Sequence, residues 1–135
     1  MSSPHGGPVH ILVVEDDPAS LLMAQVALEK AGHTVDGAAS AAEARVLLQR
    51  KRPQLILMDL VLPGIDGLEF TRQLKADPET TGIPVVALTA QGMPMYQRAA
   101  AAAGCDGFLL KVGSPSVLSG QVRELLDAFA ERPVS

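Results

Sequence analysis

The chain has 135 residues, a formal net charge of −4 and a composition that is 47% apolar. This length fits one domain with a single core, and the acidic balance argues against a partner held through nucleic-acid phosphates. The one cysteine, Cys105, excludes an internal disulfide, which fits a reducing compartment. No segment resembles a signal peptide or reaches the length of a membrane span. We therefore expect a soluble, cytoplasmic single domain.

The first predicted strand and helix follow a polar segment. Residues 1–8 are rich in Ser, Gly and Pro, so we expect a flexible arm there. Residues 10–14 form a β-branched run that predicts a strand. Asp17 followed by Pro18 is typical of a helix N-cap and first helical position, and Gly32 is a natural stop for that helix.

Two further strand–helix pairs are predicted in the middle of the chain. Residues 34–38 indicate a weak strand, and Ser40 with Glu43 forms a capping box that opens the second helix. Residues 55–58 are continuously apolar and predict a third strand, after which Asp66 leads into a third helix.

The last four elements complete the alternation. Residues 85–88 and 108–110 predict the fourth and fifth strands, and the alanine-rich residues 94–103 predict the helix between them. Ser114 followed by Pro115 repeats the cap-and-proline signal for a last helix. We expect the buried stripe of that helix to consist of Val117, Val122, Leu125, Leu126 and Phe129.

Strands that alternate with helices indicate a parallel sheet covered by helices on both faces. For a chain of this length we expect an α/β flavodoxin-like (βα)5 sandwich with strand order 2-1-3-4-5. Continuously apolar strands support this fold, because strands buried on both faces need no alternation of apolar and polar residues. The predicted domain spans residues 9–131, with a short tail at 132–135.

Reactive side chains stand at the carboxyl ends of four predicted strands. Strand one ends at Glu15 and Asp16, strand three at Asp59, strand four at Thr89 and strand five at Lys111. In the expected strand order the winding reverses between strands one and three, and ligands bind beyond the strand ends at that point. We therefore predict that these side chains share one site.

Carboxylates gathered at one place favour a divalent cation. At ~4 Å and an effective dielectric constant near 20, each pair of like charges would cost about 4 kcal/mol. An all-oxygen ligand set without His or Cys favours Mg²⁺, which usually also holds a phosphate. Lys111 and Thr89 suit the remaining phosphoryl oxygens, and Asp59 could be a nucleophile that forms an acyl phosphate.

Four segments, in this order and at these spacings, resemble the receiver domain of two-component response regulators: ILVVEDD, LILMDLVLPGIDG, VVALTA and AGCDGFLLK. The resemblance covers roughly residues 9–131. It implies that Asp59 accepts a phosphoryl group from a phosphohistidine on a sensor histidine kinase or a histidine phosphotransfer protein. It also implies a Mg²⁺ cofactor held by Glu15, Asp16, Asp59 and the backbone carbonyl of Val61.

The resemblance implies a switch as well. Thr89 would bind the phosphoryl group and move toward it while Phe108 turns inward, and Lys111 would pair with the phosphoryl group from the other side. This change would remodel the face formed by the fourth helix, fifth strand and fifth helix, which would bind a downstream protein. The net charge and the lack of a membrane-span pattern lead us to expect no nucleic-acid or membrane partner, and we expect a monomer or a weak homodimer. The resemblance implies self-dephosphorylation rather than enzymatic turnover of an external substrate.

The sequence departs from the family pattern after Lys111. The family places a proline there, joined by a cis peptide bond, whereas this chain has Val112 and Gly113. A cis bond before Val112 would cost ~2.5–4 kcal/mol, so we expect a trans bond and a rearranged loop.

Other interpretations remain open at this point. Asp59 could be a solvated acid at a strand end, and Glu15 and Asp16 could be ordinary helix-start acids. Thr89 could be a cap, Lys111 a surface residue and Phe108 a core or half-buried aromatic. A phosphatase with an aspartyl nucleophile would need a second acid two residues after Asp59, where Val61 stands. A dinucleotide-dependent oxidoreductase lacks its glycine-rich fingerprint. The main alternative is a pseudo-receiver, a binding module of the same fold that works without phosphorylation.

Overall fold

The computed structural model describes residues 7–62, 66–90, 94–111 and 114–131. Most of the predicted arm, the whole predicted tail and the peptide bond between Lys111 and Val112 lie outside these residues. Five strands and five helices alternate within the described part of the chain. None of these helices has the length and apolar character that a membrane span requires.

The elements follow the order expected from the sequence. The strands are β1 (His10–Val14), β2 (Thr34–Ala38), β3 (Leu55–Met58), β4 (Val85–Thr89) and β5 (Gly107–Leu110). The helices are α1 (Pro18–Lys30), α2 (Ala41–Arg50), α3 (Gly67–Ala76), α4 (Pro94–Ala103) and α5 (Pro115–Ala130). All strands pair in parallel in the order β2-β1-β3-β4-β5, which confirms the predicted flavodoxin-like fold.

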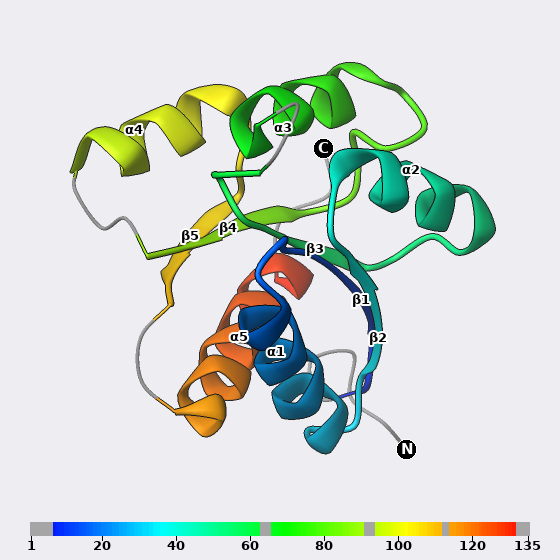
Figure 1. Ribbon diagram of the computed structural model, residues 1–135, viewed down its shortest axis with the longest axis vertical. Helices are drawn as coiled ribbons and strands as arrows, with labels where there is room; N and C mark the ends of the chain where they lie inside the picture. The colour runs from blue at the N-terminus through cyan, green and yellow to red at the C-terminus, as the bar shows by residue number, and fades with distance from the viewer. Residues whose placement is uncertain (1–6, 63–65, 91–93, 112–113, 132–135) are drawn as a thin grey trace.

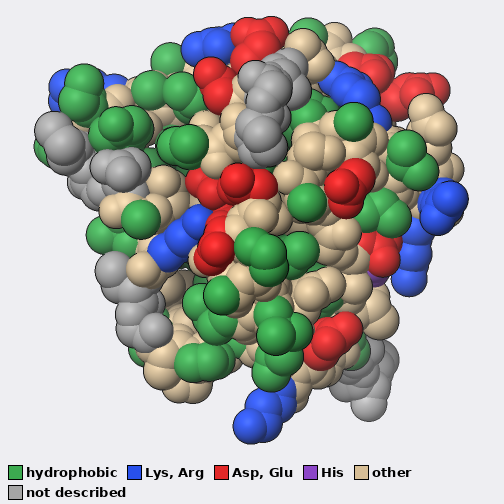
Figure 2. Space-filling view, in the orientation of Figure 1, with side chains coloured by type: hydrophobic (Ala, Val, Ile, Leu, Met, Phe, Trp, Pro, Cys, Tyr) green, Lys and Arg blue, Asp and Glu red, His purple; other side chains and the backbone are tan. Residues whose placement is uncertain are grey.

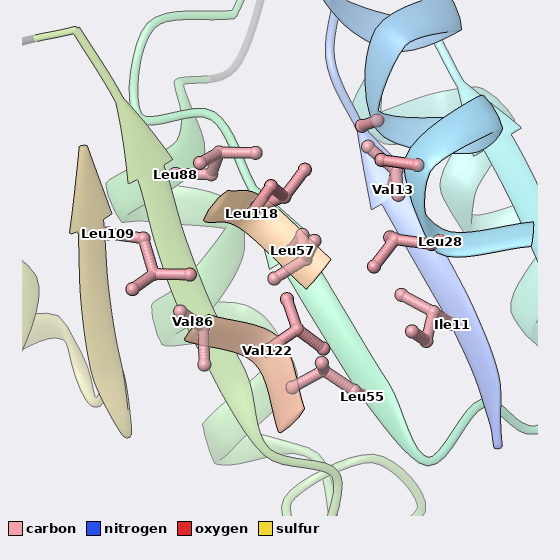
Figure 3. Close-up of a cluster of buried hydrophobic side chains, with 12 residues drawn as sticks. Ile11, Val13, Leu28, Leu55, Leu57, Val86, Leu88, Leu109, Leu118 and Val122 are labelled. Atoms are coloured by element: carbon pink, nitrogen blue, oxygen red, sulfur yellow. The ribbon is translucent and has the colours of Figure 1, made fainter. Parts of the chain in front are cut away.

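Helices cover both faces of the sheet: α2, α3 and α4 lie on one face, and α1 and α5 lie side by side on the other (Figure 1). Successive strand residues point to opposite faces, so the continuously apolar strands fill two cores. The core under α1 and α5 contains the fully buried Ile11, Leu28, Leu57 and Val122, which converge from strands and helices in Figure 3. The core under α2 and α3 includes the fully buried Phe70.

The starts of α1 and α2 follow the predicted capping chemistry. The Asp17 carboxylate accepts a hydrogen bond from the N–H of Ser20 at 3.0 Å, which confirms its role as a helix cap. The Ser40 hydroxyl accepts from the N–H of Glu43 at 3.2 Å. The Glu43 carboxylate accepts from the N–H of Ala39 rather than from that of Ser40, so the capping box is shifted by one residue on its return side.

The start of α5 differs from the prediction in two respects. Ser114 occupies the N-cap position, but its hydroxyl makes no cap hydrogen bond and pairs with that of Ser116. Val117 was expected in the buried stripe but is 43% exposed, whereas Leu118 is 5% exposed. Leu118 lies one helical turn before Val122 and shares its face, while Val117 is rotated toward solvent. The other predicted members of the stripe, Leu125, Leu126 and Phe129, pack against the core.

Candidate functional site

The carboxyl ends of the parallel strands bring the predicted site residues to one edge of the sheet. Glu15 and Asp59 directly follow β1 and β3, which pair in register. Thr89 ends β4, and Lys111 directly follows β5. The N–H of Asp59 donates to the carbonyl of Val14 at 2.9 Å, and the N–H of Lys111 donates to that of Thr89 at 2.8 Å. The hydrogen-bond ladder of the sheet therefore extends one residue past each strand and fixes the backbone of Asp59 and Lys111.

Burial differs among these residues. Glu15, Asp59 and Thr89 are buried, with exposed fractions of 2%, 7% and 1%, whereas Asp16 is exposed. On the face shown in Figure 2, acidic side chains gather near the centre with a basic side chain beside them. Buried carboxylates require a positive partner, a metal ion or a bound proton, because desolvation of an unpaired charge is costly.

Lys111 is the positive partner that the structure provides. Its Nζ donates to both carboxylate oxygens of Glu15 at 2.7 Å and to Oδ2 of Asp59 at 3.2 Å. The ammonium group therefore lies between the two buried carboxylates. Lys111 reaches the acidic site even though Val112, rather than proline, follows it.

Asp59 is held on both of its carboxylate oxygens. Oδ1 accepts a hydrogen bond from the N–H of Val61 at 3.0 Å, and Oδ2 faces Lys111. This arrangement fixes the orientation of the carboxylate at the strand end. Val61 thus contacts Asp59 through its N–H, and the metal-ligand role of its carbonyl stays a prediction.

The shared environment shifts the pKa values of Glu15 and Lys111. Burial raises the pKa of Glu15 from 4.5 to about 7; Asp59 adds to this rise and Lys111 opposes it. Burial alone would lower the pKa of Lys111, but the hydrogen bonds and charges of Glu15 and Asp59 outweigh it and raise the pKa above 10.5. Lys111 therefore stays charged, and one ammonium group faces an excess of carboxylates.

The acidic residues fit a divalent cation. Glu15, Asp16 and Asp59 each offer a carboxylate oxygen, and these three atoms lie within 4.8 Å of one another. Carboxylate oxygens are the ligands that Mg²⁺ prefers. Because Asp16 is exposed, one side of the group is open to water ligands or to a phosphoryl group. Asp17, the next residue, is instead engaged as the cap of α1.

The two predicted switch residues lie on neighbouring strands. Thr89 is at the sheet edge that carries the acidic residues. Phe108 pairs with Ala87 in the β4–β5 register and is half-buried on the α4 side, where it packs near Leu60 and Ala100. The structure therefore brings Thr89 to the site and places Phe108 outside it.

Gly67, the first residue of α3, lies next to the site, and the sequence alone did not identify it as a site residue. A Cβ atom at this position would lie 2.0 Å from the backbone oxygen of Asp59. The segment Asp66-Gly67 signals a turn into a helix. It carries no sign that this helix approaches the peptide group of Asp59.

Comparison with known proteins agrees with this geometry. A family model described as the response regulator receiver domain matches residues 11–123. Response regulator Rre1 from Synechocystis sp. is 39% identical over 120 residues, which cover 88% of this chain and 52% of that protein. This chain spans about half the length of several such curated relatives.

Solved structures show the same similarity over nearly their whole length. A response regulator from Chloroflexus aurantiacus has a TM-score of 0.81 and 33% identity, covering 89% of this chain and 98% of that one. The Mn²⁺-bound form of response regulator Rcp1 has a TM-score of 0.75 and 29% identity, covering 94% and 98%. The strand order, the acidic edge and these matches lead to one conclusion: the chain belongs to the response regulator receiver domain family.

Proposed function

We propose that this chain accepts a phosphoryl group on Asp59 from a phosphohistidine of a sensor kinase or phosphotransfer protein. Receiver domains act in two-component phosphorelay signalling, and this chain is one of them. The observation that carries the proposal is the placement of Asp59. Its buried carboxylate ends the central strand β3, with Lys111 on one oxygen and two further acids nearby.

Different residues of the chain would carry out different parts of the phosphoryl transfer. A carboxylate oxygen of Asp59 would attack phosphorus while the bond to the histidine nitrogen breaks, which leaves imidazole and an acyl phosphate. The N–H of Val61 holds this carboxylate in place beforehand. Lys111 already contacts Asp59, and its ammonium group would pair with the negative charge of the phosphoryl group. The Thr89 hydroxyl would donate a hydrogen bond to a phosphoryl oxygen.

We propose Mg²⁺ as the cofactor, held by Glu15, Asp16, Asp59 and the carbonyl of Val61. When bound, the ion would neutralise charge on the phosphoryl oxygens. The three carboxylate oxygens that lie close together support this assignment. The Mn²⁺-bound form of Rcp1 supports a divalent cation in a relative of the same fold.

We propose the face formed by α4, β5 and α5 as the output surface, with Thr89 and Phe108 as the switch. Support comes from an open pocket of about 270 Å³ beside Phe108, whose lining also includes Gln97 and Ala100 of α4. A half-buried aromatic with open space next to it has room to change position. The partner bound there would be a protein, with the domain working in the cytoplasm as a phosphoryl acceptor rather than as an enzyme with an external substrate.

The test is phosphorylation by a small donor. The purified protein is incubated with Mg²⁺ and acetyl phosphate, and its intact mass is measured, with EDTA and Asp59→Asn as controls. We expect one phosphoryl adduct that requires both Mg²⁺ and Asp59. If neither acetyl phosphate nor a phosphorylated histidine donor gives an adduct, the pseudo-receiver takes the place of this proposal.

A further inference from the structure

Gly67 makes an unusually close backbone contact behind the proposed phosphoacceptor. A Cβ at this position would lie 2.0 Å from the backbone oxygen of Asp59, 2.9 Å from its carbonyl carbon and 2.8 Å from the Cα of Leu60. All three neighbours are backbone atoms, which cannot rotate away as the end of a flexible side chain can. The first turn of α3 therefore rests directly on the peptide group that follows Asp59.

Hydrogen bonds hold the peptide groups on either side of the one that follows Asp59. The N–H of Asp59 donates to the carbonyl of Val14 in β1 at 2.9 Å. On the other side, the N–H of Gly67 donates to the carbonyl of Leu60 at 3.1 Å. The segment that carries the carboxylate is thus clamped between a central strand and a helix start.

A buried hydroxyl ties the helix start down. Thr71 is fully buried, and its Oγ1 donates to the carbonyl of Gly67 at 2.7 Å. This bond holds the first turn of α3 closed from inside the core. The contact between Gly67 and the Asp59 backbone therefore depends on the conformation of this first helical turn, which the Thr71 hydrogen bond stabilises.

We propose that Gly67 is a positioning residue for Asp59: its missing side chain lets α3 hold the Asp59 peptide group where the carboxylate meets Glu15, Asp16 and Lys111. The inference rests on the proposed function, because it concerns the cation site that phosphoryl transfer would use. It assigns a cause for the position of Asp59 that lies outside the charged residues themselves.

The displacement that a side chain would force is large on the scale of the site. Real Cβ contacts essentially never fall under 3.0 Å, whereas an alanine Cβ at position 67 would start 2.0 Å from the Asp59 oxygen. Gly67→Ala must therefore move the two apart by at least about 1 Å. The three ligand oxygens lie within only 4.8 Å of one another. A shift of about 1 Å at a reacting group can cost about 100-fold in rate. Mg²⁺ in turn demands near-ideal octahedral ligand geometry.

The test compares Gly67→Ala with Gly120→Ala. Gly120 is also a helical glycine, but it is exposed and a Cβ there would meet nothing within 4 Å. Mg²⁺ is titrated into each ¹⁵N-labelled protein, and the Asp59 and Leu60 amide signals are followed. We expect Gly67→Ala to displace these signals and to weaken Mg²⁺ binding at least about tenfold, while Gly120→Ala binds as the wild type does. A folded Gly67→Ala protein with unchanged Mg²⁺ affinity would overturn the proposal.

A second variant covers loss of folding. If Gly67→Ala does not fold, the same Mg²⁺ titration is made with Thr71→Val. This substitution removes the hydrogen bond from the Thr71 hydroxyl to the Gly67 carbonyl and keeps the shape of the side chain. We expect weaker Mg²⁺ binding there too, and unchanged affinity would overturn the proposal. A wild-type protein that binds Mg²⁺ but takes up no phosphoryl group would remove the proposed function and leave the positioning role standing.

Discussion

Replacement of Lys111 by methionine removes the only positive group that contacts Glu15 and Asp59 among the described residues. Methionine keeps most of the apolar stem of lysine and deletes the ammonium group. Three charge-assisted hydrogen bonds are lost, two to Glu15 at 2.7 Å and one to Asp59 at 3.2 Å. Both carboxylates stay buried, so the folded state has to bear their repulsion or take up a proton.

The structure sets the size of the effect. Breaking a buried ion pair on one side costs about 3–5 kcal/mol of unfolding free energy. Protonation of Glu15 reduces this loss of unfolding free energy. The pKa of Glu15 is already raised to about 7, so a proton can replace the missing ammonium group near neutral pH. We therefore expect a loss of about 2–3 kcal/mol near neutral pH, below the usual range for such pairs.

Urea unfolding followed by circular dichroism, with and without excess Mg²⁺, measures this loss. We expect Mg²⁺ to recover much of it, because a divalent cation can take the place of the ammonium group between the carboxylates. Lys75→Met is the matched control. The Lys75 Nζ lies 2.9 Å from Asp106 Oδ2 in a second mostly buried pair, away from the acidic edge. The stability that Lys75→Met loses should not be restored by Mg²⁺. A Lys111→Met loss under about 0.5 kcal/mol, or one indifferent to Mg²⁺, refutes this reasoning.

Three further substitutions test the fold. Gly120→Ala should raise the unfolding free energy by about 0.5–1 kcal/mol, because an exposed helical position gains propensity without a clash; no gain in urea unfolding would contradict this. Phe70→Ala should cost about 3–5 kcal/mol in the same assay, since Phe70 is fully buried in the core under α2 and α3. Burial lowers the pKa of His33, with help from Arg123, and its Nδ1 accepts from the N–H of Val9. The contribution of His33 to stability should therefore fall as pH drops below about 6.5, by at most about 1.4 kcal/mol per pH unit. The raised pKa of Glu15 acts in the opposite direction, so the contribution is measured as the difference in pH dependence between the wild type and His33→Asn, and identical pH dependence would contradict it.

The strand order could be expected from the sequence because strands that alternate with helices predict a parallel sheet, even though residues 34–38 give only a weak strand signal. Residues 55–58 and 85–88 are continuously apolar, as strands buried on both faces must be. Once the order was known, parallel pairing had to place the residues that follow the strands at one edge. For this reason Glu15 and Lys111, 96 residues apart in the chain, could be assigned to one site before their contact was known.

The sequence could not define contacts that depend on how a helix sits on the sheet. Val117 and Leu118 are both apolar, and only the docking of α5 shows that Leu118 is buried. The Ser114 hydroxyl had a neighbour, Ser116, that competes with the helix N–H groups for it. The close approach of Gly67 to Asp59 likewise arises from tertiary packing, and a local Asp-Gly pattern contains no information on it.

The most direct test of the central claim is chemical mapping of the phosphorylated residue. After reaction with acetyl phosphate and Mg²⁺, the protein is reduced with borohydride, which converts an aspartyl phosphate to homoserine, and its peptides are sequenced by mass spectrometry. The account predicts homoserine at Asp59 and at no other aspartate. Homoserine at Asp16 or Asp17 instead, or an adduct that resists reduction, would contradict it.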